Sequence, residues 1–390
     1  MPTLGTALSK RRSRSGDFLA VLLLLAIVAG VGWLWWHEKH PHNNSPKRAV
    51  PSEQTVNPPP VHVVIPSLVL VRRTPESTPE KADAVSPAVS SNAPPEPAPV
   101  VLAEFPRPAK NPLEAQIALA RRVISPGAID GAIGSQTRAA LATFQRLAGI
   151  VPTRALDTNT RSLLTLAAPL LTDYVVTSND LARLQPLGKT WLAKSQQSAL
   201  EYETILELVA EKAHAYQSLI EELNPEVDWT NVVAGTRLKI PEVVYPEPPD
   251  KAAFVVIHLS DKFLEAFGTE SNLLAHFPCS IAARVEKRPV GELHVAVVAP
   301  NPNYTFDPAI FTDSPEVQAI GHKLVLPPGP NNPVGVAWIG LDKPGYGMHG
   351  TPGPEQIGRT ESHGCFRLAN WDAEYLVKLV WIGMPVYVEP

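Results

Sequence analysis

The hydrophobic residues of this chain follow three patterns, each in its own stretch of sequence. The first is a continuous apolar run without charges at residues 18–36, which ends in tryptophans and follows basic residues at positions 10–14. A helix of about 20 apolar residues crosses a bilayer core of ~30 Å. Since basic residues stay on the cytoplasmic side, the run predicts a single-pass membrane anchor with an exported remainder. A cleavable signal peptide is the alternative.

The second pattern places apolar residues at helical spacing. Residues 113–120 and 139–147 predict two helices around a turn-rich segment, and Ser135 is a candidate N-cap for the later one. Residues 202–211 and 219–223 predict two further helices, which an Asn-Pro pair and a short apolar run follow.

The third pattern is typical of β-strands. Runs at residues 254–259, 293–298 and 386–388 are rich in branched and aromatic side chains, and residues 371–380 predict one helix. Prolines and glycines between residues 301 and 345 predict long loops. Mixed strands with turn signals favour a β-sandwich or partial barrel.

Composition separates these stretches and limits the partners. Many of the 42 prolines lie between residues 37 and 111, where short apolar segments have no core to join, so this stretch predicts a disordered linker. A net charge of −4 over 390 residues indicates no nucleic-acid partner. The chain is therefore predicted to be multidomain, with a cytoplasmic N-terminus at 1–16, a transmembrane anchor at 17–36, the linker at 37–111, a small all-α domain at 112–168, an α+β module at 172–243 and a mainly β domain at 251–390.

Two short motifs near the C-terminus carry the candidate chemistry. One is His-Gly-Thr at residues 349–351, and the other is Ser-His-Gly-Cys-Phe-Arg-Leu at residues 362–368. A free thiol with a pKa of about 8.5 is only a few per cent thiolate at neutral pH, and a nearby imidazole can take its proton. Glycines let backbone N–H groups approach a developing oxyanion. The parts suit acyl transfer through a thioester on Cys365.

Zinc ligation is the alternative use of these side chains. His363 and Cys365 are only two residues apart, and no further ligand completes a familiar spacing, so we expect neither a metal nor a cofactor. Cys279 lies in an apolar strand-like segment and is interpreted as a small buried hydrophobe. A reversible disulfide between Cys279 and Cys365 is the competing hypothesis.

The C-terminal stretch resembles the L,D-transpeptidase catalytic domain of the YkuD type. The resemblance is carried by residues 259–261, 288–292, 326–329, 347–351, 357–359, 362–368 and 383–386. One departure is Arg288, where Thr is commoner. The resemblance implies that Cys365 is the nucleophile, that His349 is the proton donor and acceptor, and that the backbone of Gly350 orients His349. Backbone N–H groups of His363 and Gly364 would belong to the oxyanion loop.

The resemblance also implies the substrate and the reaction. The donor would be a tetrapeptide stem of peptidoglycan, and the acceptor an amine of a second stem, a protein lysine, a D-amino acid or water. Arg367, Ser362 and Tyr346 are the substrate-binding candidates, although Arg367 also reads as a solvated surface residue. The alternatives are an L,D-carboxypeptidase and a non-catalytic peptidoglycan-binding scaffold.

The two middle segments resemble wall-binding modules. Residues 129–131, 134, 137–140, 144–145 and 149–150 are similar to the small peptidoglycan-binding domain. Residues 219–225 and 233–241 are similar to the LysM module, with its first strand expected near residues 174–177 and a long insertion after it. The resemblances imply peptidoglycan glycan strands and stem peptides as partners. A structural spacer and a structural adaptor are the competing interpretations.

Overall fold

The computed structural model describes residues 105–310, 317, 320–359, 362 and 364–390. The expected cytoplasmic segment at 1–16, the anchor at 17–36 and most of the linker at 37–111 lie outside the described residues. In the described part of the chain, none of the helices combines the length and apolarity needed to span a membrane.

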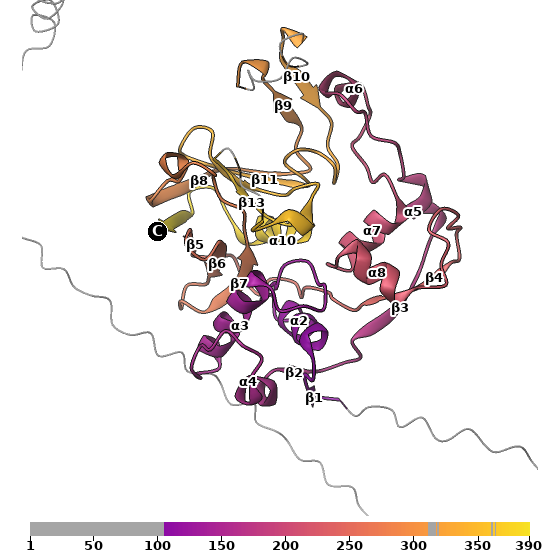
Figure 1. Cartoon of the computed structure of the whole chain (residues 1–390). Helices are drawn as coiled ribbons and strands as arrows, with labels where there is room; N and C mark the ends of the chain where they lie inside the picture. Colours follow the sequence, from indigo (N-terminus) through magenta and orange to yellow (C-terminus); the bar gives the residue numbers. More distant parts are fainter. Residues whose placement is uncertain (1–104, 311–316, 318–319, 360–361, 363) are drawn as a thin grey trace, which may run out of the picture. The chain divides into compact units, whose positions relative to one another are not determined.

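The first module is a small helical domain (Figure 1). It consists of β1 (Arg107–Pro108), α2 (Pro112–Ala120), α3 (Ser135–Leu147), α4 (Thr158–Leu163) and β2 (Thr165–Leu166), and β1 pairs with β2. Asn111 caps α2 because its side chain accepts a hydrogen bond from the Glu114 N–H. The expected cap at Ser135 is wrong by one residue: Gly134 is the N-cap of α3, and its lack of a side chain leaves the helix without a side-chain cap bond.

The second module has two antiparallel strands with helices between them. Its elements are β3 (Leu171–Val175), α5 (Ser178–Ala182), α6 (Trp191–Ser195), α7 (Ile205–Lys212), α8 (Gln217–Leu223) and β4 (Arg237–Pro241). The helices α5 and α6 form an insertion between β3 and α7. Trp191 of this insertion stacks on Phe306 of the next domain, with ring centroids 4.3 Å apart. The insertion therefore packs outside its own module.

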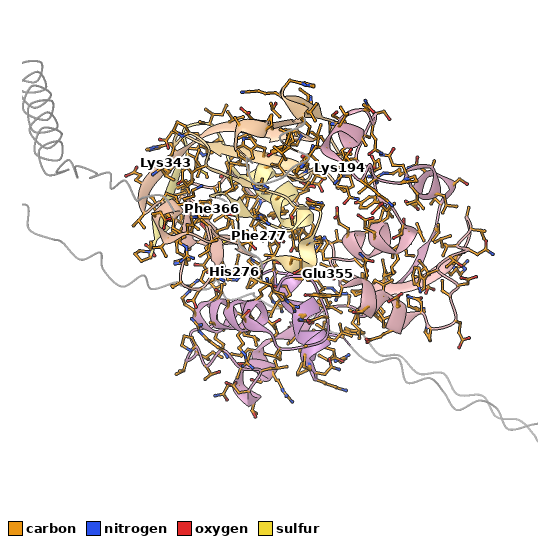
Figure 2. The ribbon with its side chains drawn as sticks, turned by 45° about the horizontal axis from the view of Figure 1, so that its top comes forward. Lys194, His276, Phe277, Lys343, Glu355 and Phe366 are labelled. Atoms are coloured by element: carbon orange, nitrogen blue, oxygen red, sulfur yellow. The ribbon has the colours of Figure 1, made fainter. Side chains whose placement is uncertain are left out.

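The C-terminal domain is mainly β, as predicted, and is built on one eight-stranded sheet with the order β13-β12-β11-β8-β14-β5-β6-β7. These strands are β5 (Phe254–His258), β6 (Phe263–Phe267), β7 (Leu273–Pro278), β8 (Gly291–Pro300), β11 (Ala337–Leu341), β12 (Gly347–His349), β13 (Phe366–Arg367) and β14 (Pro385–Glu389). Phe277 and Phe366 are fully buried within it (Figure 2). Helix α10 (Asn370–Leu379) buries Leu376 and Leu379 in the same core.

The expectation of long loops between residues 301 and 345 is partly wrong. The segment contains β9 (Tyr304–Phe306), β10 (Leu324–Leu326) and β11, and β9 pairs with β10 as a separate antiparallel ribbon. Short single-turn helices complete the domain at Val285–Lys287, Pro308–Ile310 and Pro354–Gln356. The strands were missed because each is short and is stabilised by pairing with distant residues rather than by local propensity.

The helical domain packs on the sheet edge formed by β7, where α3 lies beside that strand (Figure 1). Thr143 and Arg146 of α3 both contact the carboxylate of Glu265, which is buried on β6. Arg154 forms a two-bonded ion pair with Asp261 nearer the surface, at 3.0 and 2.9 Å. Buried and exposed ion pairs therefore join the two domains side by side.

Candidate active site

The two candidate motifs lie on neighbouring parallel strands. Strand β12 pairs with β13, and the register places His349 opposite Arg367. Cys365 directly precedes β13. Besides the larger effect of burial, the charge of Arg367 acts on the pKa of both His349 and Cys365, so the imidazole and the thiol both lie near this guanidinium.

The imidazole of His349 is buried and held in one tautomer. Its Nδ1 lies 2.6 Å from the carbonyl oxygen of Gly350. A carbonyl only accepts, so Nδ1 carries the proton and Nε2 has a free lone pair. The Trp338 ring stacks on the imidazole with centroids 5.6 Å apart. Burial lowers the pKa of His349 to about 4, although the Gly350 carbonyl opposes this, so the ring is neutral at pH 7.

The thiol of Cys365 is partly covered and also uncharged at neutral pH. Burial raises its pKa, and the backbone N–H of Gly347 and the charge of Arg367 oppose the rise. Its Sγ lies 3.4 Å from the carbonyl oxygen of Gly345 and donates to it. The site therefore holds a neutral thiol and a neutral imidazole rather than a preformed ion pair.

The turn before Cys365 is fixed by Ser362. Its hydroxyl donates to the carbonyl oxygen of Cys365 at 2.5 Å and accepts from the Gly364 N–H at 3.2 Å. Ser362 is buried, and its backbone pairs with Ile281 and Ala283. Its contacts thus shape the turn, and its expected substrate contact stays a prediction. His363 lies outside the described residues.

The remaining substrate-binding candidates border the thiol. Arg367 is half-buried, and burial lowers its pKa while the neighbouring Cys365 opposes this. The Tyr346 ring lies beside Gly364, where an added Cβ would be 3.8 Å from it, and Lys343 lies over the same ring at 5.1 Å. The substrate contacts expected of Arg367 and Tyr346 stay predictions.

Sequence reasoning missed three residues around this pair. Trp338 covers His349, and Tyr304 of β9 lies close enough to Cys365 for a thiolate there to raise its pKa further, burial being the larger cause. Asn370 is buried, and its Oδ1 accepts from the Thr351 N–H at 3.0 Å. Of the three, only Asn370 left a signal, as a polar residue at the first position of a helix that follows the cysteine motif.

The second cysteine is separate from this chemistry. Cys279 is fully buried, burial raises its pKa to about 12, and both cysteines are free thiols. Among the described residues, no three His, Cys, Asp or Glu side chains gather as metal ligands.

Comparison with known families agrees with this geometry. Residues 252–388 match the family described as "L,D-transpeptidase catalytic domain", of the YkuD type. The C-terminal part of this chain is similar to L,D-transpeptidase catalytic domains. Residues 109–164 match a second family, described as "Putative peptidoglycan binding domain". This match covers the helical domain and ends before the second module, whose LysM resemblance stays a prediction.

Individual relatives carry the same family name. The chain is 25% identical over 189 residues to "Putative L,D-transpeptidase YkuD" of Bacillus licheniformis, which covers 48% of this chain and 94% of that protein. It is 29% identical over 184 residues to "Probable L,D-transpeptidase YbiS" of Escherichia coli K12, which covers 46% of this chain and 58% of that protein. The match to "Putative L,D-transpeptidase YqjB" of Bacillus subtilis is 32% identical and spans 51% of that protein. The chain thus spans about half the length of the last two relatives.

Among solved structures, L,D-transpeptidase 3 from Mycobacterium tuberculosis is 18% identical, with a TM-score of 0.29, and the match covers 41% of this chain and 77% of that one.

Proposed function

We propose that this protein is a peptidoglycan L,D-transpeptidase in which Cys365 forms a thioester with a tetrapeptide stem and passes it to an amine. The observation that carries the proposal is the parallel pairing of β12 and β13, which sets His349 opposite Arg367, two residues after Cys365. The bond from His349 Nδ1 to the Gly350 carbonyl adds the third element of a nucleophile, base and orienting group.

In the acylation step, Sγ attacks the carbonyl carbon of the third stem residue. Because the thiol and the imidazole are both neutral, Nε2 takes the thiol proton as the C–S bond forms. The tetrahedral intermediate then collapses, the C–N bond breaks, and the imidazolium returns this proton to the departing D-alanine amine. In the second step the acceptor amine attacks the thioester, His349 takes its proton, and the thiolate leaves and is reprotonated.

The oxyanion of the intermediate would be stabilised by backbone N–H groups of the turn at residues 363–365. The Gly364 N–H donates to the Ser362 hydroxyl at 3.2 Å. This hydrogen bond is long and therefore weak, so the oxyanion would replace the hydroxyl as the acceptor. Arg367 is placed to bind a substrate carboxylate by charge-assisted hydrogen bonds. Ser362 would act by holding the turn, and Tyr346 would contact the stem beside Gly364.

The accessory modules would keep the enzyme at the wall. We assign the helical domain to peptidoglycan binding. We assign the β3–β4 module to a LysM-type fold, because helices α7 and α8 follow the α5–α6 insertion between two antiparallel strands. The anchor at residues 17–36 would hold the protein in the membrane with its catalytic domain exported. Weak binding by linked modules raises the local concentration of the enzyme at a fixed polymer.

The test is incubation of the full-length protein with purified tetrapeptide muropeptides, followed by mass spectrometry. We expect cross-linked dimers and released D-alanine, and no product from Cys365→Ala. Tripeptide without dimers would instead identify an L,D-carboxypeptidase, in which water is the acceptor. If the protein forms no product and no Cys365 adduct with a carbapenem, the enzymatic proposal fails and a scaffold remains.

A further inference from the structure

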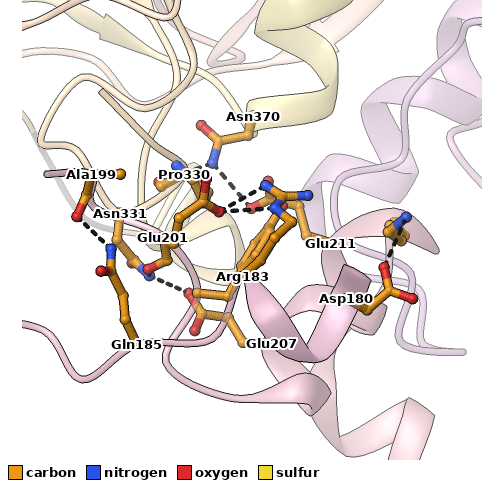
Figure 3. Close-up of polar contacts among 12 residues, drawn as sticks. Asp180, Arg183, Gln185, Ala199, Glu201, Glu207, Glu211, Pro330, Asn331 and Asn370 are labelled. Atoms are coloured by element: carbon orange, nitrogen blue, oxygen red, sulfur yellow. Dashed lines mark hydrogen bonds and ion pairs between the residues drawn. The ribbon is translucent and has the colours of Figure 1, made fainter. Parts of the chain in front are cut away.

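Both the oxygen and the nitrogen of the Asn370 side-chain amide form hydrogen bonds, which link Asn370 to three other segments of the chain. Its Oδ1 accepts from the Thr351 N–H at 3.0 Å and from the Val336 N–H at 3.3 Å. Its Nδ2 donates to the Pro330 carbonyl at 3.2 Å and to Glu211 Oε2 at 3.0 Å (Figure 3). The amide is buried, so each of these groups would lose a partner if it moved.

The contact with Thr351 bears directly on the catalytic base. The N–H of Thr351 and the C=O of Gly350 belong to one planar peptide unit, and the two groups point to opposite sides. The C=O end accepts from His349 Nδ1 at 2.6 Å, while the N–H end donates to Asn370. A rotation of this peptide plane would therefore change both hydrogen bonds together.

The space around this amide allows little adjustment. A Cβ added at Gly335 would lie 2.0 Å from Asn370 Oδ1, and one added at Gly350 would lie 2.3 Å from the same atom. The amide is thus wedged between two backbone segments, and its orientation decides whether Oδ1 or Nδ2 faces the Thr351 N–H. An amide has no intrinsic preference between the two orientations, so its hydrogen-bond partners set it.

The partner outside the catalytic domain is Glu211, which comes from α7 of the second module (Figure 3). Burial raises the pKa of Glu211 to about 7, although the bonds from Asn370 and Tyr202 oppose this, so the side chain is mainly ionised above that pH. The ionised carboxylate only accepts, so it requires the NH₂ end of Asn370 and leaves Oδ1 for the Thr351 N–H. The hydroxyl of Tyr202 donates to the other oxygen of Glu211 at 2.9 Å. Helix α7 also contacts the residue after Pro330: Asn331 Nδ2 donates to Glu207 Oε1 at 2.6 Å.

We propose that Glu211 is a positioning residue for the transpeptidase reaction, acting through Asn370 and the peptide between Gly350 and Thr351 on the tautomer and aim of His349. The second module is then a working part of the active site in addition to any wall-binding role. This inference rests on the proposed function for its kinetic consequence, while its structural consequence at His349 does not need turnover.

The kinetic test compares Glu211→Ala, Glu211→Gln and a matched control in the full-length protein. Glu201→Gln is the control, because Glu201 lies in the same cluster but its side chain pairs with Arg183. For Glu211→Ala we expect a fall in kcat of about tenfold or more with KM within about twofold, since misplacement of a catalytic group affects the chemical step. Glu211→Gln keeps an acceptor for Asn370 and should recover most of the loss.

The second readout is the tautomer of His349, measured by the ¹⁵N chemical shifts of its ring. We expect the Nδ1–H form in the wild type and in Glu201→Gln, and a mixture of tautomers in Glu211→Ala. If Glu211→Ala matches Glu201→Gln in both kcat and tautomer, the inference is overturned. If the wild type does not turn over muropeptides but the tautomer still responds to Glu211, the proposed function fails and the positioning role stands.

A milder variant covers the case in which Glu211→Ala does not fold. Tyr202→Phe removes only the hydroxyl that donates to Glu211. A fall in kcat of about twofold or more with a shifted His349 tautomer would support the inference, since loss of this hydrogen bond leaves Glu211 less firmly held. Unchanged kcat and tautomer in folded Tyr202→Phe would count against it.

Discussion

Replacement of Glu265 by alanine tests how much its buried contacts between the helical domain and the catalytic domain contribute to the free energy of unfolding. Glu265 is 1% exposed and accepts from Thr143 Oγ1 at 2.9 Å. It forms a close ion pair with Arg146 and lies 3.4 Å from Nδ1 of the fully buried His276. In the variant, Thr143 and the buried His276 lose this acceptor, whereas Arg146 is 52% exposed and can be hydrated. Leaving a buried polar group without its partner costs about 1–3 kcal/mol, and we expect a loss of that size in the free energy of unfolding.

The assay is urea unfolding of the purified full-length protein at pH 7, followed by tryptophan fluorescence. Arg154→Ala is the matched control, because its ion pair with Asp261 joins the same two domains but the two side chains are 50% and 37% exposed. Exposed pairs contribute about 0–1 kcal/mol. Equal effects of Glu265→Ala and Arg154→Ala would refute the reasoning that burial makes the difference.

The pH dependence of the same variant gives a second check. Burial is the largest single influence and would raise the pKa of Glu265, but hydrogen bonds from His258 and His276 together outweigh it and lower this pKa. A carboxyl with a lowered folded-state pKa stabilises the protein above its unfolded value of about 4.3 and loses that contribution as the pH falls below it. The stability difference between the wild type and Glu265→Ala should therefore shrink on acidification from pH 5 downward. A difference that grows with acid would contradict the lowered pKa.

Three further predictions follow from the active site. Because burial raises the pKa of Cys365, its alkylation by iodoacetamide should accelerate up to and beyond about pH 9, whereas a plateau near pH 7 would indicate a preformed thiolate. Because the pKa of His349 is lowered to about 4, kcat/KM should stay level from pH 7 to 5 and fall near pH 4; a midpoint near 6.5 would contradict a buried base. Gly335→Ala should lower kcat and Tm more than Gly345→Ala does, because both glycines have positive φ but only an alanine at 335 would collide with Asn370. Equal losses in the two glycine variants would mean that backbone strain alone is responsible.

The sequence predicts what depends on local pattern and misses what depends on distant contacts. The helix expected at residues 371–380 is α10 at Asn370–Leu379, and the strand expected at residues 254–259 is β5 at Phe254–His258. The cysteine and histidine motifs were visible because their residue types are rare and chemically specific. The contact between Asn370 and Glu211 spans 159 positions, and no local rule predicts it. Glu211 reads as an ordinary polar position of an amphipathic helix until another domain covers it.

The place of β14 in the catalytic sheet has a consequence for how the protein is made. Residues 385–389 pair with β8 on one side and with β5 on the other, so they occupy the middle of the sheet although they are synthesised after all its other strands. Until these residues pair, the sheet exists as two halves, each with an open edge that can recruit other chains. A truncation that removes β14 should therefore leave these two halves unjoined and make the product prone to proteolysis or aggregation.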